Sequence, residues 1–153
     1  MDFVKQPLFS PHQNPAARLS SSLKHHQDHS LDRAYLGLDF LWALTPSKGD
    51  YILLNFSQPL HIHRYLFRSG DVETSLDRFY NTTVEVRPSS ELKSKHTSGF
   101  SLTPDGFFVV GRFDKGRAEG RVNETLQPVS ALRLMVQQDS DFWVMLKEIF
   151  IEV

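Results

Sequence analysis

Short apolar runs separated by turn residues constrain the fold of this chain more than any other feature. The clearest runs lie at 51–56, 61–68, 83–87, 107–110, 131–137 and 142–153. Val84 and Val86 alternate with polar residues, and Leu132, Leu134 and Val136 share one face, which is the two-residue period of a half-buried strand. Because such runs recur about every 8–12 residues with turn signals between them, the sequence predicts an all-β sandwich or barrel.

Helical periodicity is weak throughout the chain. Only residues 72–79 have room for one or two helical turns, which disfavours the α/β folds that bind nucleotides. The chain has 153 residues, of which 40% are apolar and 12% aromatic. This is enough for one domain with aromatic side chains filling the gap between two sheets.

Charge and composition exclude several classes of protein. The formal net charge of −1 lacks the basic excess of a protein that binds nucleic acid through its phosphates. Cysteine is absent, so disulfides, thiolate metal sites and cysteine nucleophiles are excluded. No run approaches the ~20 apolar residues of a membrane span, so we expect no direct membrane insertion. Residues 1–7 lack the basic start and apolar run of a targeting signal.

Residues 1–30 differ in composition from the rest. They hold three of the eight prolines, four of the seven histidines, a serine run and no glycine, and their apolar residues follow no period. This pattern predicts a tail or linker over 1–30 and a sandwich domain over 31–153.

No credible catalytic constellation is present, and we expect no cofactor and no metal. The acidic triplet Asp139–Asp141 is interpreted as a polar turn between strands, because Asp and Ser favour turns. The histidines of 25–29 lie in the predicted linker, without groups to orient them as ligands. His61 and His63 are two apart and are interpreted as a solvent-facing pair. No Gly-x-Ser-x-Gly elbow occurs, and the glycines at 111, 116 and 120 lack the strand–turn–helix context of a phosphate loop.

The loop that follows residue 67 is the most suggestive polar segment. It contains Arg68, Asp71, Glu73 and Asp77 ahead of the strand at 83–87. A solvated loop is the ordinary interpretation, but convergent charged groups over an aromatic face also suit a sugar, whose hydroxyls need donors and acceptors. The aromatic residues that could supply that face are Trp42, Phe40, Phe79 and Tyr80.

Three Asn-x-Ser/Thr triplets begin at Asn55, Asn81 and Asn123. Each is a candidate glycan acceptor in a lumenal protein. Asn55 falls within a predicted strand, so we expect it to be the poorest acceptor of the three.

Several separate motifs resemble the N-acetylglucosaminyltransferase IV family, the alpha-1,3-mannosyl-glycoprotein 4-beta-N-acetylglucosaminyltransferases. They occur in the family's order over roughly residues 20–153, and comprise 20–24, 39–53, Tyr65-Leu66-Phe67-Arg68-Ser69-Gly70, 81–86, Ala118-Glu119-Gly120 and the ending from Trp143 to Ile151.

The resemblance is to the C-terminal domain of those enzymes. It implies a discoidin-like, jelly-roll β-sandwich similar to carbohydrate-binding modules that recognise N-acetylglucosamine. It further implies a Golgi lumenal location, partners that are N-glycans bearing N-acetylglucosamine, and a neighbouring glycosyltransferase catalytic domain. The catalytic domain itself is not in these residues, so we expect glycan recognition by this chain rather than sugar transfer.

Glu73 and Asp77 match the acidic positions of the family's loop motif. Together with Asp71, Arg68 and Trp42, which are chosen from residue type and position, they form the predicted ligand-binding set. Asp71 replaces the family's Asn, and Thr74-Ser75 replaces its His-Pro. These departures leave open a second function, a regulatory module that binds protein rather than sugar.

Overall fold

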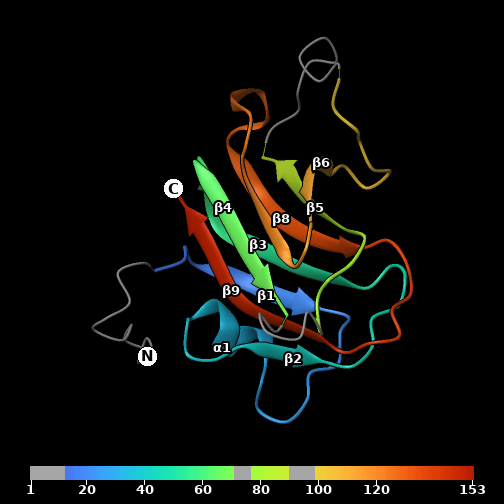
Figure 1. Cartoon of the computed structure of the whole chain (residues 1–153). Helices are drawn as coiled ribbons and strands as arrows, with labels where there is room; N and C mark the ends of the chain where they lie inside the picture. The colour runs from blue at the N-terminus through green and yellow to red at the C-terminus, as the bar shows by residue number, and fades with distance from the viewer. Residues whose placement is uncertain (1–12, 71–76, 90–98) are drawn as a thin grey trace.

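Two antiparallel β-sheets packed face to face make up the fold, as the computed structural model shows for residues 13–70, 77–89 and 99–153 (Figure 1). The first sheet has the strand order β1-β3-β8-β5-β6 and the second the order β2-β9-β4-β7. The elements are β1 (Ala17–Ser21), α1 (Leu31–Tyr35), β2 (Leu41–Ala43), β3 (Tyr51–Leu60), β4 (Arg64–Ser69), β5 (Thr82–Pro88), β6 (Phe108–Arg112), β7 (Arg117–Arg121), the 3-10 turn η2 (Glu124–Leu126), β8 (Val129–Val136) and β9 (Val144–Glu152). The all-β sandwich predicted from the sequence is confirmed.

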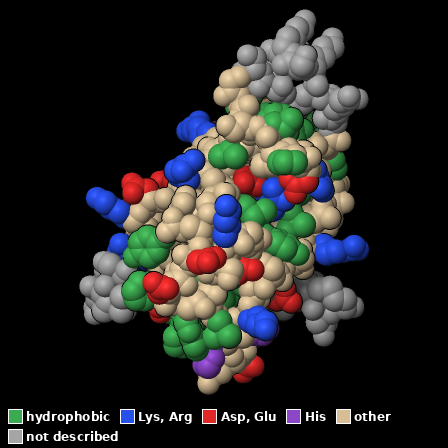
Figure 2. Space-filling model, turned by 90° about the vertical axis from the view of Figure 1, so that its right-hand side faces the viewer, with side chains coloured by type: hydrophobic (Ala, Val, Ile, Leu, Met, Phe, Trp, Pro, Cys, Tyr) green, Lys and Arg blue, Asp and Glu red, His purple; other side chains and the backbone are tan. Residues whose placement is uncertain are grey.

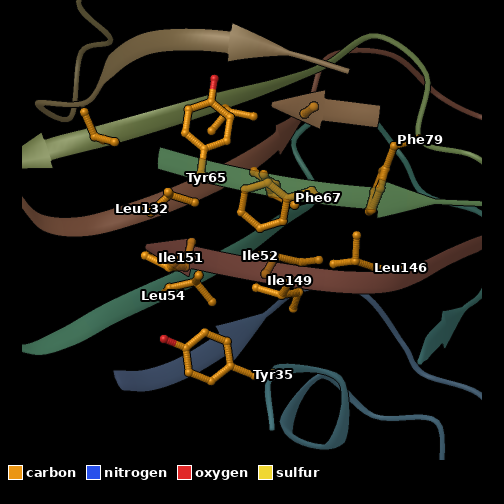
Figure 3. Close-up of a cluster of buried hydrophobic side chains, with 14 of the residues drawn as sticks. Tyr35, Ile52, Leu54, Tyr65, Phe67, Phe79, Leu132, Leu146, Ile149 and Ile151 are labelled. Carbon is orange, nitrogen blue, oxygen red and sulfur yellow. The ribbon is translucent and has the colours of Figure 1, made fainter. Parts of the chain in front are cut away.

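Alternation of apolar and polar residues sets which side of each strand faces the core. On β3 the buried residues are Ile52, Leu54 and Phe56, and their neighbours are only half-buried. Ile52 and Leu54 lie with Tyr65 and Phe67 of β4 in the gap between the sheets (Figure 3), and all five side chains belong to one buried cluster. Each large apolar side chain fully buried there contributes about 1.5–3 kcal/mol to the hydrophobic stabilisation of the fold.

Two charged residues are buried in the centre of the first sheet. Glu85 of β5 is 1% exposed and Arg133 of β8 is 7% exposed. The Glu85 Oε1 atom accepts from Nε and Nη2 of Arg133 at 2.8 and 2.6 Å, and its Oε2 atom accepts from the Thr83 hydroxyl at 2.8 Å. The guanidinium also lies 3.8 Å from the centre of the Phe107 ring. These bonds satisfy groups that would be costly to bury without partners.

Four strand-to-strand connections gather at one end of the sandwich, because β2, β4, β6 and β8 all run toward it. We call this the loop end; its described residues are 44–50, 70, 77–81, 113–116 and 137–143. The pairing of Thr82 with Val136 and of Ser69 with Leu146 joins these connections through both sheets. The loop end therefore brings together parts of the chain that are far apart in sequence.

Residues assigned from composition to a tail include a strand of the sandwich. Ala17–Ser21 forms β1 and pairs with β3 from Ala17↔Phe56 to Ser21↔Ile52. Its only sizeable apolar residue is Leu19, so the segment shows no apolar run, and its place is set by pairing at the sheet edge rather than by its own pattern. Residues 1–12 lie outside the described residues.

Two further elements differ from the sequence-based expectation. The one α-helix among the described residues is α1, capped at its start by the Ser30 hydroxyl, which accepts from the Arg33 backbone N–H at 3.4 Å. At five residues it is too short to show a helical period. Strand β7 was also not predicted, because its polar sequence buries little more than Ala118. Of residues 72–79, which had room for one or two helical turns, 72–76 lie outside the described residues and 77–79 are not helical. No described helix has the length and apolarity to span a membrane.

Candidate functional site

Trp42 and Asp77 lie on either side of Met145 at the loop end. Trp42 of β2 is the cross-strand partner of Met145 of β9. The Asp77 carbonyl accepts from the Met145 N–H at 2.7 Å. The structure therefore brings together two of the five residues predicted to bind a ligand, one aromatic and one acidic.

Asp77 has an unusual backbone conformation. Its φ angle is +58°, in the left-handed region that costs a residue with a side chain on the order of 1 kcal/mol. Asp tolerates this conformation better than most residues. Its side chain is half-buried, and its carboxylate makes no hydrogen bond or ion pair with any described residue. Such a carboxylate is available to accept hydrogen bonds from a ligand.

Aromatic rings surround Trp42. The Trp42, Trp143 and His26 rings lie 4.9–5.2 Å apart, centre to centre. Trp42 Nε1 is the one buried side-chain polar atom without a hydrogen-bond partner in the described part of the chain. On one face of the molecule, hydrophobic side chains gather beside histidine at the lower edge (Figure 2). The planes of the rings are inclined to one another by 56–78°, so the three side chains form a cluster of edge-to-face and tilted aromatic contacts.

His29 connects this aromatic group to an ion pair. Its ring stacks on Phe40 at 4.3 Å, and its Nδ1 atom lies 2.9 Å from a carboxylate oxygen of Asp39. Desolvation acts to raise the pKa of Asp39, but hydrogen bonds from the Phe40 N–H and the His29 ring outweigh it and lower that pKa. The centre of the His29 ring also lies 6.1 Å from that of Trp42, so His29 contacts the rings of both Phe40 and Trp42.

Arg68 lies on the exposed face of β4 and not in the aromatic group. Its Nη1 atom is 3.5 Å from Glu148, and it lines a basic cleft that includes Gly70. The Gly70 N–H donates to the Met145 carbonyl at 2.9 Å, so the cleft adjoins the Trp42–Asp77 region. Asp71 and Glu73, the other two predicted ligand-binding residues, lie outside the described residues.

A second hollow lies at the same end, in the β8–β9 connection. It measures about 280 Å³ and is lined by Tyr80 and Phe142, which are 46% and 52% exposed, with Asp139 and Asp141. Tyr80 was among the aromatic residues considered for a sugar face. Phe142 was missed, although it directly follows the acidic triplet in the sequence.

Phe79 was wrongly considered as a ligand face. It is 2% exposed, and its ring packs 5.2 Å from that of Phe113 in the core. Its backbone N–H donates to the Ser69 hydroxyl at 2.9 Å. The Phe79 side chain points into the core and the Tyr80 side chain points to solvent. The sequence of the loop does not show which of the two neighbours is buried.

Histidines and carboxylates do not converge on a metal site in the described part of the chain. The His61 Nε2 atom lies 2.5 Å from Glu124, and both His61 and His63 are exposed on either side of the buried Ile62. Asp139 accepts from the Lys48 backbone N–H at 2.8 Å, within the turn predicted for residues 139–141.

The three candidate glycan acceptors occupy different environments. Asn55 lies inside β3 between its partners Arg18 and Ala131. Asn81 and Asn123 lie in connections. The Asn81 side-chain amide donates to the Gln138 side chain at 2.9 Å, and the Asn123 side-chain oxygen Oδ1 accepts from the Thr125 N–H at 2.9 Å.

Comparison with known proteins places these observations in a family. A family model described as the MGAT4 C-terminal domain matches residues 17–148. The chain is 50% identical, over 99% of its length, to alpha-1,3-mannosyl-glycoprotein 4-beta-N-acetylglucosaminyltransferase A of Xenopus tropicalis. It is 44% identical, also over 99% of its length, to the B enzyme of Homo sapiens. The chain spans 28% and 29% of the length of these two relatives.

The fold is also shared with a solved carbohydrate-binding structure. That protein is a chitosan-binding module, in complex with chitotriose, from a chitosanase/glucanase of Paenibacillus sp. IK-5. The TM-score is 0.64 over 91% of this chain and 98% of the module, with 12% sequence identity. At that identity the likeness shows the sandwich fold, and the module's own ligand is a property of the module.

Proposed function

The chain belongs to the MGAT4 C-terminal domain family, and from that premise we propose that it is a glycan-binding module for terminal N-acetylglucosamine on N-glycans. The relatives it matches carry the names of N-acetylglucosaminyltransferases, and the related fold of a chitosan-binding module is one on which sugar sites are built. We further propose that it acts in the Golgi lumen beside a glycosyltransferase catalytic domain, where it holds substrate or product glycans.

The observation that carries this proposal is the arrangement of Trp42 and Asp77 around Met145. An indole face can cover the apolar face of a pyranose ring, while the carboxylate accepts from its hydroxyls. The carboxylate has no described partner to displace, and the Met145 hydrogen bond fixes the backbone of its residue. Affinity for a monosaccharide is expected to be weak, because its hydroxyls exchange water for protein at small net gain.

The departures at Asp71, Thr74 and Ser75 favour one alternative, in which the module binds a transferase and no sugar. The exposed aromatic residues Tyr80 and Phe142 would then belong to the protein interface. The two functions differ in their response to free sugar, so one titration separates them.

The proposal is tested by titrating N-acetylglucosamine into the whole chain and following amide shifts by NMR. Asp77→Asn is the informative variant, because Asn also tolerates the left-handed conformation and the fold is retained. A bond to a charged group is about twice as strong as a neutral one, so removing the charge should weaken binding roughly tenfold. Asp77→Ala should remove measurable binding.

Asp141→Asn is the matched control, since it removes the same charge from an exposed residue at the same end of the sandwich. Unchanged affinity for this control and loss for Asp77→Asn support the proposed site. Loss of affinity for Asp141→Asn alone would indicate that the sugar binds in the Tyr80–Phe142 hollow instead. No shifts at all in the wild-type chain would leave the protein-binding function as the better account.

A further inference from the structure

Five cationic side chains line one cleft at the loop end. The cleft measures about 350 Å³. Its described lining contains the charged residues Arg68, Arg78, Lys115, Arg117 and Lys147, and no carboxylate. The chain as a whole has a formal net charge of −1. The cluster is therefore a local concentration of positive charge and not the consequence of a basic protein.

The cations reach the cleft from three strands and two connections. Arg68 of β4 and Arg117 of β7 are direct cross-strand partners, and Lys147 comes from β9 on the other side of β4. Arg78 and Lys115 come from the β4–β5 and β6–β7 connections. Like charges brought together in this way repel one another, so the arrangement has an electrostatic cost unless an anion occupies the cleft.

Only two of the five cations have an acidic partner in the described part of the chain. Arg68 lies 3.5 Å from Glu148, and Arg117 lies 3.0 Å from Glu119. No described carboxylate lies within ion-pair distance of Arg78, Lys115 or Lys147. Three of the five cations therefore have no ion-pair partner among the described residues.

Lys115 has a backbone conformation that lysine rarely adopts. Lys115 and Gly116 have φ angles of +52° and +80°. Asp114 and Arg117 exchange both backbone hydrogen bonds, at 2.8 and 3.0 Å, so the connection is a two-residue hairpin turn with both central residues left-handed. Such a turn strongly prefers Asn-Gly, and a lysine there is strained. The strain favours a functional role for the side chain that this rigid turn presents.

Backbone forms the floor of the cleft. A side chain on Gly116 would meet the Ser69 carbonyl oxygen at 2.5 Å and Nε of Arg78 at 3.1 Å. The Ser69 N–H donates to the Gly116 carbonyl at 2.6 Å, which fixes β4 against the turn. The cations are therefore mounted on rigid backbone, as a binding site requires.

We propose that this cleft binds the sulfate or phosphate ester of an acidic glycan. Guanidinium groups pair with such tetrahedral anions through two parallel bonds, and ammonium groups add point charges. Arg78 directly follows Asp77, and Gly70 joins the cleft to Met145, so an ester on a sugar bound at Trp42 and Asp77 lies within reach. The sugar part of this proposal rests on the proposed function; the anion site does not.

The test compares N-acetylglucosamine with its 6-sulfate and its 6-phosphate, because the exocyclic 6-position gives an ester the longest reach. Inorganic sulfate and phosphate are titrated separately as probes of the cleft alone. Exposed charge pairs are weak, so each unpaired cation adds about two- to five-fold, and three add on the order of tenfold or more. This gain should shrink as salt concentration rises.

Lys115→Asn is the decisive variant, because Asn is the residue that the turn prefers and the fold should be retained or stabilised. It should lose about two- to five-fold in affinity for the two esters, on the scale of one exposed charge pair, and none for neutral N-acetylglucosamine. Adding Lys147→Gln should remove most of the remaining gain. Lys24→Asn, which removes an exposed lysine outside the cleft, is the matched control and should change nothing.

The outcomes separate the two proposals. Anion binding without sugar binding would support the cleft and overturn the proposed function. Sugar binding with no gain from either ester, and no response to inorganic anions, would overturn the cleft alone. Equal losses of ester affinity in Lys115→Asn and Lys24→Asn would also overturn the proposed anion site. A preference for one of the two esters identifies the anion that the cleft binds.

Discussion

Gly111→Ala should destabilise the fold through one identifiable contact. Tyr65 is 1% exposed and its hydroxyl points out of the central cluster toward the strands that carry Gly111 and Gly120 (Figure 3). A methyl group on Gly111 would stand 2.2 Å from the Tyr65 hydroxyl oxygen and 3.4 Å from the ring carbon that bears it. The clash therefore requires a shift of roughly 1 Å in a close-packed interior, and overpacking of this kind costs about 1–3 kcal/mol.

Tyr65→Phe should rescue that variant. Removing the hydroxyl leaves the 3.4 Å approach as the nearest contact, which is ordinary packing. The hydroxyl's own bond to the Val110 carbonyl is long, at 3.4 Å, so Tyr65→Phe alone should cost less than the typical ~1 kcal/mol of a hydrogen bond.

Urea unfolding of the wild type, both single variants and the double variant measures the coupling. We expect Gly111→Ala to lower the free energy of unfolding by about 1–3 kcal/mol. In a thermal scan this corresponds to a fall of about 2–12 °C in melting temperature, at roughly 2–4 °C per kcal/mol for a chain of this size. The double variant should recover most of this loss. Additive effects in the double variant would refute the argument from the hydroxyl contact.

Three further predictions concern buried charge, pH and glycosylation. Glu85→Ala should cost about 3–5 kcal/mol in urea unfolding, because it leaves the Arg133 guanidinium buried without that partner; a cost under 1 kcal/mol would contradict the assignment. Hydrogen bonds, the largest of them from Arg133, hold the pKa of Asp105 well below 3.8. Its contribution to stability is therefore complete above pH 3.8 and declines as the pH falls below that value. Asp105→Asn should make the stability depend less on pH in this acidic range, and an unchanged dependence would contradict the assignment. Expression through a glycosylating secretory pathway should modify Asn81 and Asn123, whose occupancy glycopeptide mass spectrometry measures; both sites found empty would contradict it.

Much of the fold could be predicted because the apolar runs were the core strands. The alternation on β3 follows from burial of one face, whereas β5 and β8 are buried over most of their length. Strands β1 and β7 escaped prediction for the opposite reason. They lie at sheet edges, their apolar content is low, and backbone pairing with one neighbour holds them in place.

The candidate site could be predicted only in part. Asp77 and Trp42 were selected from residue type and family resemblance, and the backbone of Met145 links them, which no local pattern encodes. Trp143 and His26 were not chosen, although a tryptophan and a histidine run were visible in the sequence. The basic cleft gave no signal, because its residues are spread over 80 positions and only tertiary pairing of β4, β7 and β9 brings them together.

The central claim, glycan recognition by this chain, is tested most directly on an array of N-glycans that differ in their terminal sugar. We predict retention of the chain by glycans that end in N-acetylglucosamine, reduced retention when galactose covers that sugar, and competition by free N-acetylglucosamine. Absence of binding to every N-glycan on the array, by chain shown to be folded by its cooperative unfolding, would contradict the claim.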